Sequence, residues 1–61
     1  MAQQVWAFLA TTPESWAARD LARRLDMPER TVRAQLARLV GAGKVERRFY
    51  KGGGRLVWKA I

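Results

Sequence analysis

Arginine is the residue type in this sequence with the greatest capacity for chemistry. Nine arginines and three lysines stand against five carboxylates in a chain of 61 residues, which gives a formal net charge of +7 and a pI near 11.5. A guanidinium group presents a planar fork of donors that pairs with phosphate oxygens and with the edge of guanine. So basic a chain favours a polyanionic partner, either a nucleic acid or an anionic membrane surface.

These charges are unevenly distributed along the chain. Through Ala18 the only charged side chain is Glu14. From Arg19 onward, 12 basic side chains stand against 4 acidic ones. The first third of the chain is therefore a nearly neutral apolar element, and contacts with an anion are expected from the remainder.

Enzymatic chemistry is poorly supplied. The chain has neither histidine nor cysteine, so it lacks an imidazole to activate its hydroxyl groups and the usual ligands of a zinc site. Five scattered carboxylates are the candidates for general acid–base catalysis. No apolar run approaches the roughly 18 residues of a membrane span, and the first ten residues do not resemble a secretory signal. We expect a cytoplasmic binding protein that is not an enzyme and uses no cofactor, metal or membrane.

The spacing of apolar residues predicts three helices. Apolar side chains recur on one side, at about 100° per residue, over residues 2–11, 16–25 and 28–42. Pro13 ends the first helix, because the residue before a proline avoids the helical region. Ser15 is the nearest side chain that could cap the second helix. Asp26 tolerates the left-handed backbone of a tight turn, and Gly43 supplies the stop of the third helix.

Residues 44–61 are predicted to form a two-stranded antiparallel hairpin. A turn centred on Gly52-Gly53 matches the positive φ angles of tight hairpins. Counting outward from that turn gives the pairs Tyr50–Arg55, Phe49–Leu56, Arg48–Val57, Arg47–Trp58, Glu46–Lys59 and Val45–Ala60. This register gathers apolar side chains on one face, and a slip of one residue would scramble that face. We expect Phe49 and Trp58 on this face to pack in or around the core.

The order helix, helix, tight turn, helix, basic hairpin is that of a winged helix-turn-helix domain. Residues 19–48 resemble the core pattern of that family, which is carried here by Leu21-Ala22, Leu25, Val32, Leu36, Leu39, Gly43 and Val45. Residues 44–61 are similar to the family's wing. Ala17 departs from the pattern, which usually has a Ser or Thr cap just before Leu-Ala.

The resemblance implies a fold and a function. The fold is a single α+β, mainly α, domain over residues 1–61, with three helices followed by the wing. The function is sequence-specific binding of double-stranded DNA by a transcriptional regulator, as a repressor or an accessory protein of a bacterial, archaeal or mobile-element genome. A cytoplasmic, nucleoid-associated location follows from that function.

The third predicted helix is the candidate recognition helix. With Val32, Leu36 and Leu39 facing the core, its opposite side combines arginines with small residues, and a slim exposed face is what the major groove admits. By analogy with helix-turn-helix docking, the N-terminal half lies deepest in the groove. The candidate base contacts are Arg30, Thr31, Arg33 and Gln35, with Ala34 on the slim face and Arg38 nearer the backbone. Gln35 is suited to the edge of adenine.

The wing is the second candidate contact. The resemblance implies that its tip lies along or in the adjacent minor groove. Two glycines would suffice for the turn, so the third adds slack that lets the flanking cations adjust to the DNA backbone. The candidate DNA-binding residues of the wing are Arg48, Lys51, Gly53 and Arg55.

Other partners stay open at this point. A winged helix also serves as a protein-binding module, in which case exposed aromatic residues such as Trp6 or Trp16 would mark the partner surface. Related winged helices bind left-handed DNA or structured RNA by shape. A homodimer through the first helix or the strand ends would imply a palindromic operator.

Overall fold

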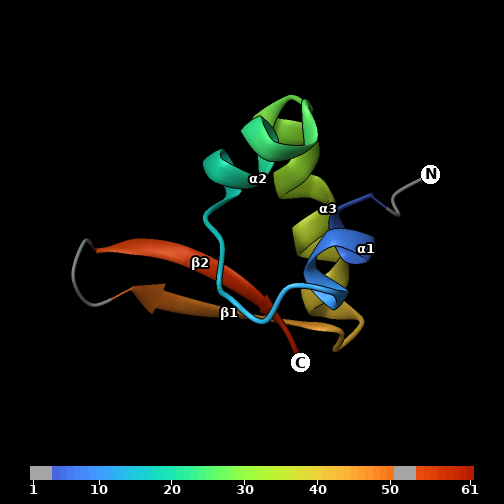
Figure 1. The fold of residues 1–61 in the computed structure, drawn as a ribbon. Coiled ribbons are helices and arrows are strands. Elements are labelled where there is room, and N and C mark those ends of the chain that lie inside the picture. The colour runs from blue at the N-terminus through green and yellow to red at the C-terminus, as the bar shows by residue number, and fades with distance from the viewer. Residues whose placement is uncertain (1–3, 51–53) are drawn as a thin grey trace.

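Three helices and a hairpin follow one another along the chain. The computed structural model describes residues 4–50 and 54–61, with α1 at Gln4–Ala10, α2 at Ala18–Leu25, α3 at Glu29–Gly41, β1 at Val45–Tyr50 and β2 at Arg55–Ala60. The helices lie at one end of the hairpin, whose other end extends well away from them (Figure 1). This architecture confirms the predicted winged helix-turn-helix fold.

All five elements contribute to one apolar core. Its buried side chains are Val5, Leu9, Ala18, Leu21, Ala22, Val32, Leu36, Leu39, Val45 and Trp58. The predicted inward stripe of α3 is among them, and α3 packs against α1, α2 and β1. One side of α3 is thus fixed by the core, which leaves the opposite side free for contacts.

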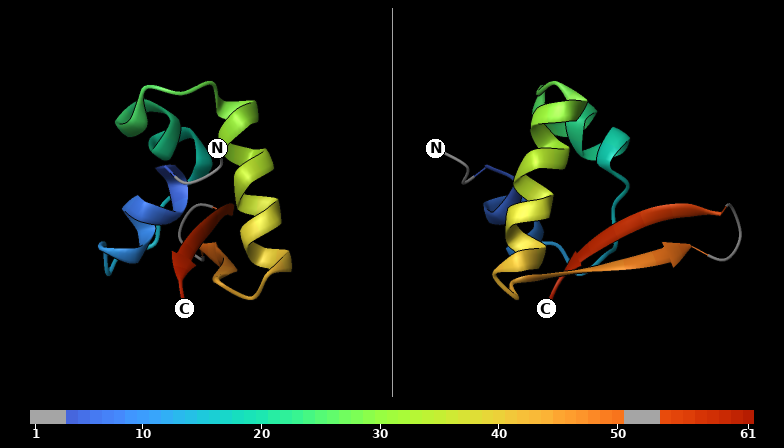
Figure 2. Two further views of the ribbon diagram at one scale, coloured as in Figure 1. Left: turned by 90° about the vertical axis from the view of Figure 1, so that its right-hand side faces the viewer. Right: turned by 180° about the vertical axis from the view of Figure 1, so that it is seen from behind.

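The hairpin has the predicted register. β1 and β2 pair antiparallel from Val45 opposite Ala60 to Tyr50 opposite Arg55. The backbone N–H of Ile61 donates a hydrogen bond of 3.1 Å to the carbonyl of Lys44, which closes the base of the hairpin. The predicted turn centre, Gly52-Gly53, lies outside the described residues. Because side chains alternate along a strand, the apolar face continues from the core toward the far end of the hairpin. That end of the hairpin extends beyond the helices (Figure 2).

The second helix begins at Ala18, two residues later than predicted. Trp16 is extended and pairs with β2, since its N–H donates to the carbonyl of Trp58 and the N–H of Trp58 donates to the carbonyl of Trp16, both at 2.8 Å. The backbone of Trp16 is therefore used by the sheet and cannot enter a helix. The predicted cap from Ser15 is wrong, because Ala17 occupies the N-cap position and forms no side-chain cap.

Two left-handed residues end the second and third helices as predicted. Asp26 has φ 54° and its backbone N–H bonds back to the last turn of α2. Gly43 has φ 74° and follows the end of α3, where the N–H of Lys44 donates to the carbonyl of Leu39 at 3.0 Å. Glycine reaches such a φ without a steric cost, and Asp is one of the few other residues that adopts it. These turns set the angles at which α3 leaves α2 and enters β1.

Candidate nucleic-acid interface

α3 presents a narrow face to the outside. Arg30, Ala34 and Arg38 are exposed on it, and Ala37 and Gly41 are exposed between and beyond them. Alanine and glycine keep this face slim, as entry into a major groove about 12 Å wide requires. Seen from behind, α3 lies in front of the other two helices, so its outer side is not covered by them (Figure 2).

Gln35 does not belong to this exposed face, so the expectation that it reaches an adenine edge is wrong. Its residue surface is 7% exposed, and its Oε1 accepts a hydrogen bond of 3.4 Å from the backbone N–H of Val5. Val5 lies in the first turn of α1, where backbone N–H groups have no partner within the helix. Gln35 therefore connects α3 to α1.

The spacing of the sequence contains a signal for this position. Gln35 follows Val32 by three residues and precedes Leu39 by four, which is the spacing of one side of a helix. Thr31, one turn before Gln35, lies on the same flank and is half-buried. A polar residue on the core-facing flank of a helix can therefore stabilise the fold instead of binding a ligand. Its burial in the structure decides which of the two roles it has.

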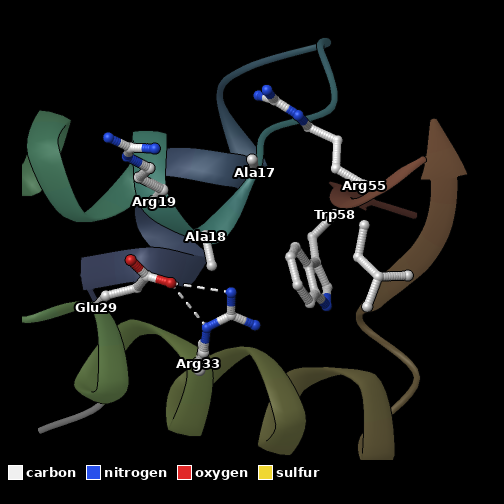
Figure 3. A pocket seen from close by; sticks show the side chains of 8 residues that line it. Ala17, Ala18, Arg19, Glu29, Arg33, Arg55 and Trp58 are labelled. Carbon is white, nitrogen blue, oxygen red and sulfur yellow. Dashed lines mark hydrogen bonds and ion pairs between the residues drawn. The ribbon is translucent and has the colours of Figure 1, made fainter. Parts of the chain in front are cut away.

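Arg33 lies on the opposite flank of α3 and is held by an ion pair. Its Nη2 is 2.9 Å from Oε2 of Glu29, and its Nε donates to the same oxygen at 3.0 Å. The two side chains are 55% and 44% exposed, respectively. Because they are four residues apart on one helix, the pair is formed within α3 itself. It directs the guanidinium of Arg33 toward α2 and β2 (Figure 3).

A hollow lies between α3, the start of α2 and β2. We call it the basic hollow; its lining residues are Ala17, Ala18, Arg19, Glu29, Arg33, Arg55, Leu56 and Trp58. Three different elements each supply one arginine to its lining, and the side chains of Arg33 and Trp58 point into it (Figure 3). Its net charge is positive, since three guanidinium groups accompany one carboxylate, that of Glu29.

The start of α2 adds backbone donors to this hollow. Ala17 and Ala18, the N-cap and the first residue of α2, line it with small side chains. The N-cap residue Ala17 makes no side-chain hydrogen bond to that turn. The N–H groups at a helix start and the helix dipole both favour an anion. The hollow therefore combines cationic side chains with the positive end of a helix.

The candidate residues of the wing fall into three groups. Arg55 is exposed and lines the basic hollow. Arg48 is exposed and paired with Glu46, with 2.9 Å between its Nη2 and Oε2 of the carboxylate. Lys51 and Gly53 lie outside the described residues.

The exposed aromatic side chains are on the wing and not on the first third of the chain. Trp6 and Trp16 are half-buried against the core, with Lys44 over the ring of Trp6 at 5.6 Å. Phe49 and Tyr50 are exposed. The expectation that Phe49 packs in or around the core is therefore wrong, because its end of the hairpin extends beyond the helices.

The comparison with protein families agrees with this geometry. The model of the IclR helix-turn-helix domain matches residues 3–48, which is three quarters of the chain and includes all three helices. The chain belongs to the IclR helix-turn-helix domain family. This is a winged helix-turn-helix family of DNA-binding transcription regulators, and such domains are in general not enzymes. A comparison with curated proteins gives no significant match.

The match to the IclR domain ends inside the hairpin. Its last residue, Arg48, lies in the middle of β1, so Phe49, Tyr50 and all of β2 are outside the matched segment. We call residues 49–50 and 55–56 of the hairpin the outer wing; the family match does not extend to it. Along residues 4–50 and 54–61, no helix combines the length and apolar character needed to cross a bilayer.

Proposed function

We propose that this IclR-type domain regulates transcription by binding a specific sequence of double-stranded DNA. The observation that carries the proposal is that Arg19, Arg33 and Arg55, from three different elements, line one hollow beside the slim face of α3. Scattered surface arginines would serve solubility equally well. Three guanidinium groups from three elements around one concave site instead match a chain of phosphates that passes between them.

In this proposal the exposed face of α3 enters the major groove. Arg30 lies near the centre of that face and in its N-terminal half, so it is the foremost candidate for a bidentate contact with guanine. Ala34 allows close approach to the base edges, and Arg38 contacts the backbone further along. Thr31, on the half-buried flank, would contact a phosphate at the edge of the groove.

The basic hollow then receives the sugar–phosphate strand that borders this groove. Arg19, Arg33 and Arg55 would neutralise its phosphates, with Arg33 exchanging its ion pair with Glu29 for a phosphate or a guanine edge. The uncapped first turn of α2 supplies N–H donors to the same strand. Arg48 and Lys51 would contact the backbone, and Gly53 would be a contact of the wing with the minor groove.

The proposal extends to assembly and location. A homodimer through α1 or the strand ends would place two α3 helices on a palindromic operator. Half-buried Trp6 on α1 and exposed Ile61 beyond β2 are the apolar groups at these surfaces that favour it. A repressor or accessory role in the cytoplasm, in association with the nucleoid, belongs to the same proposal.

A selection from randomised duplexes, read at two salt concentrations, tests the function. We expect an enriched sequence and a log–log salt slope near −4 to −5, because about five phosphates are neutralised. Arg30→Ala should relax the preference at one base position, whereas Lys51→Ala should weaken all duplexes alike. Equal affinity for every duplex would refute sequence-specific regulation, and the absence of any binding would refute the proposal as a whole.

A further inference from the structure

The outer wing carries an exposed apolar pair. Phe49 and Leu56 lie directly opposite each other in the hairpin, so their side chains share one face. Phe49 is 67% exposed and Leu56 is 37% exposed. Val45 and Trp58 lie on the same face at its inner end, where they are buried in the core. The apolar surface of this face therefore continues past the point where the helices stop covering it.

This pair adjoins the basic hollow. Leu56 lines the hollow together with Trp58 and Arg33, and Phe49 continues the same face from the neighbouring strand. The hairpin extends away from the helices in both views that show it from the side (Figures 1 and 2). A ligand that fills the hollow and continues along the wing would meet these two side chains next.

The charges around the pair select the kind of ligand. Arg47, Arg48 and Arg55 are exposed on the same hairpin, and Glu46 is the carboxylate on its described strands. A second copy of this chain would bring a similar concentration of positive charge against them, which is unfavourable. A polyanion with apolar surface between its charges fits better, and the deoxyribose walls of a DNA minor groove have that character.

We propose that Phe49 and Leu56 form an apolar wedge that enters the minor groove of bound DNA and bends the duplex. The inference rests on the proposed function and goes beyond it, since cationic contacts with the backbone do not by themselves unstack a base step. Apolar side chains inserted at a base step partly unstack it and kink the duplex toward the major groove. Pyrimidine–purine steps unstack most easily, so the wedge selects such a step at the wing position.

Phe49→Ala is the variant that tests the wedge, and Tyr50→Ala is its matched control. Tyr50 is the next residue on β1, is 57% exposed, and lies on the other face of the hairpin by strand alternation. Neither side chain supports the core, so both variants should keep the helical circular dichroism of the parent domain. Leu56→Ala removes the second half of the wedge and serves as an independent check.

The duplex enriched in the selection above is labelled at both ends, and its affinity and end-to-end energy transfer are measured at two salt concentrations. We expect Phe49→Ala to weaken binding about tenfold, since a large apolar side chain is no longer buried. We expect the salt slope to stay unchanged, because no charge is removed, and the bend of the duplex to decrease. Tyr50→Ala should change affinity less than about twofold and leave the bend intact.

Several results would overturn the wedge while leaving the proposed function standing. These are an unbent duplex with the parent domain, or equal effects of Phe49→Ala and Tyr50→Ala. Loss of self-association in Phe49→Ala would assign the pair to a dimer contact instead. Phe49-dependent binding to vesicles of phosphatidylglycerol and phosphatidylcholine, with DNA binding unchanged, would assign it to a membrane. If the parent domain binds no duplex, the proposed function itself fails.

Discussion

Glu29→Gln should change stability and DNA affinity in opposite directions. Glu29 is the carboxylate of the basic hollow, and both nitrogen contacts of Arg33 go to its Oε2, at 2.9 and 3.0 Å. In the free domain this pair stabilises α3, and the negative charge lies in the first turn, where the helix dipole favours it. In a complex with DNA the same carboxylate would face phosphates and repel them.

The stability cost can be estimated from the exposure of the pair. An exposed pair four residues apart on a helix contributes about 0.3–0.5 kcal/mol, and a carboxylate in the first turn contributes about 0.3–1 kcal/mol. Glu29→Gln should therefore cost roughly 0.5–1.5 kcal/mol, out of about 3–9 kcal/mol for a domain of this length. A fall in Tm of about 2–12 °C follows, since 1 kcal/mol corresponds to about 4–8 °C in so small a domain.

The gain in affinity follows from the number of phosphates neutralised. Because Glu29→Gln removes the one carboxylate charge of the basic hollow, the net positive charge that faces the phosphates rises by one and the log–log salt slope becomes steeper by about 0.9. If the variant and the parent domain bind equally well at 1 M salt, a slope steeper by 0.9 makes the variant bind about eightfold more tightly at 0.1 M salt. The gain should decrease steadily as salt is raised. Specific and non-specific duplexes should both bind more tightly, because the charge that is removed faces phosphates and not base edges.

Fluorescence anisotropy with a labelled duplex between 0.05 and 0.5 M salt measures the slope, and thermal unfolding measures the stability. Glu14→Gln is the matched control, because it removes the same charge from an exposed side chain that does not line the hollow. We expect it to leave the slope unchanged, because its carboxylate is not among the groups that line the hollow and face the phosphates. Weaker binding by Glu29→Gln at every salt concentration would refute the reasoning, since Glu29 would then help to form the complex.

The remaining predictions concern the core and the hollow. Gln35→Ala should lower the free energy of unfolding by about 1–3 kcal/mol, because it leaves the buried N–H of Val5 unpaired. The sequence enriched in a duplex selection should stay the same. A changed sequence would show that Gln35 contacts DNA after all. Leu36→Ala should lower the free energy of unfolding by about 2–5 kcal/mol, because Leu36 is fully buried. Circular dichroism should show a large loss of helix on mild heating. An unchanged Tm would contradict the place of Leu36 in the core. Arg55→Ala should reduce the magnitude of the salt slope by about 0.9. Arg23→Ala should leave the slope unchanged, because Arg23 lies on the exposed side of α2 and outside the hollow. Equal effects of the two variants would contradict the hollow as the binding site.

The hairpin could be predicted to the residue because two local signals agree. The glycine run fixes where the chain turns, and the apolar alternation of the flanking strands permits one register around that turn. Exposure along the hairpin could not be predicted in the same way. Alternation shows that Phe49 shares a face with Val45, but it does not show how far along that face the helices extend.

Contacts between residues distant in the sequence determine the features that could not be predicted from the sequence. Gln35 and Val5 are 30 residues apart, and nothing in the local pattern of either predicts their hydrogen bond. The start of α2 depends likewise on the pairing of Trp16 with Trp58. The arginines of α3 and the wing could be identified as candidates from their neighbours in sequence. Arg19 could not, because its role depends on α2 being placed beside β2.

The three arginines of the basic hollow can act together only because the core fixes the elements that carry them. Arg33 is positioned by the buried side of α3, while Arg19 and Arg55 lie on segments joined by the backbone pairing of Trp16 with Trp58. That pairing holds the start of α2 against β2 through two hydrogen bonds of 2.8 Å. The spacing between the guanidinium groups is thus a property of the fold and not of flexible surface side chains alone. A loss of core packing should weaken DNA binding even where no cation is removed, because the three charges would no longer meet one phosphate strand together.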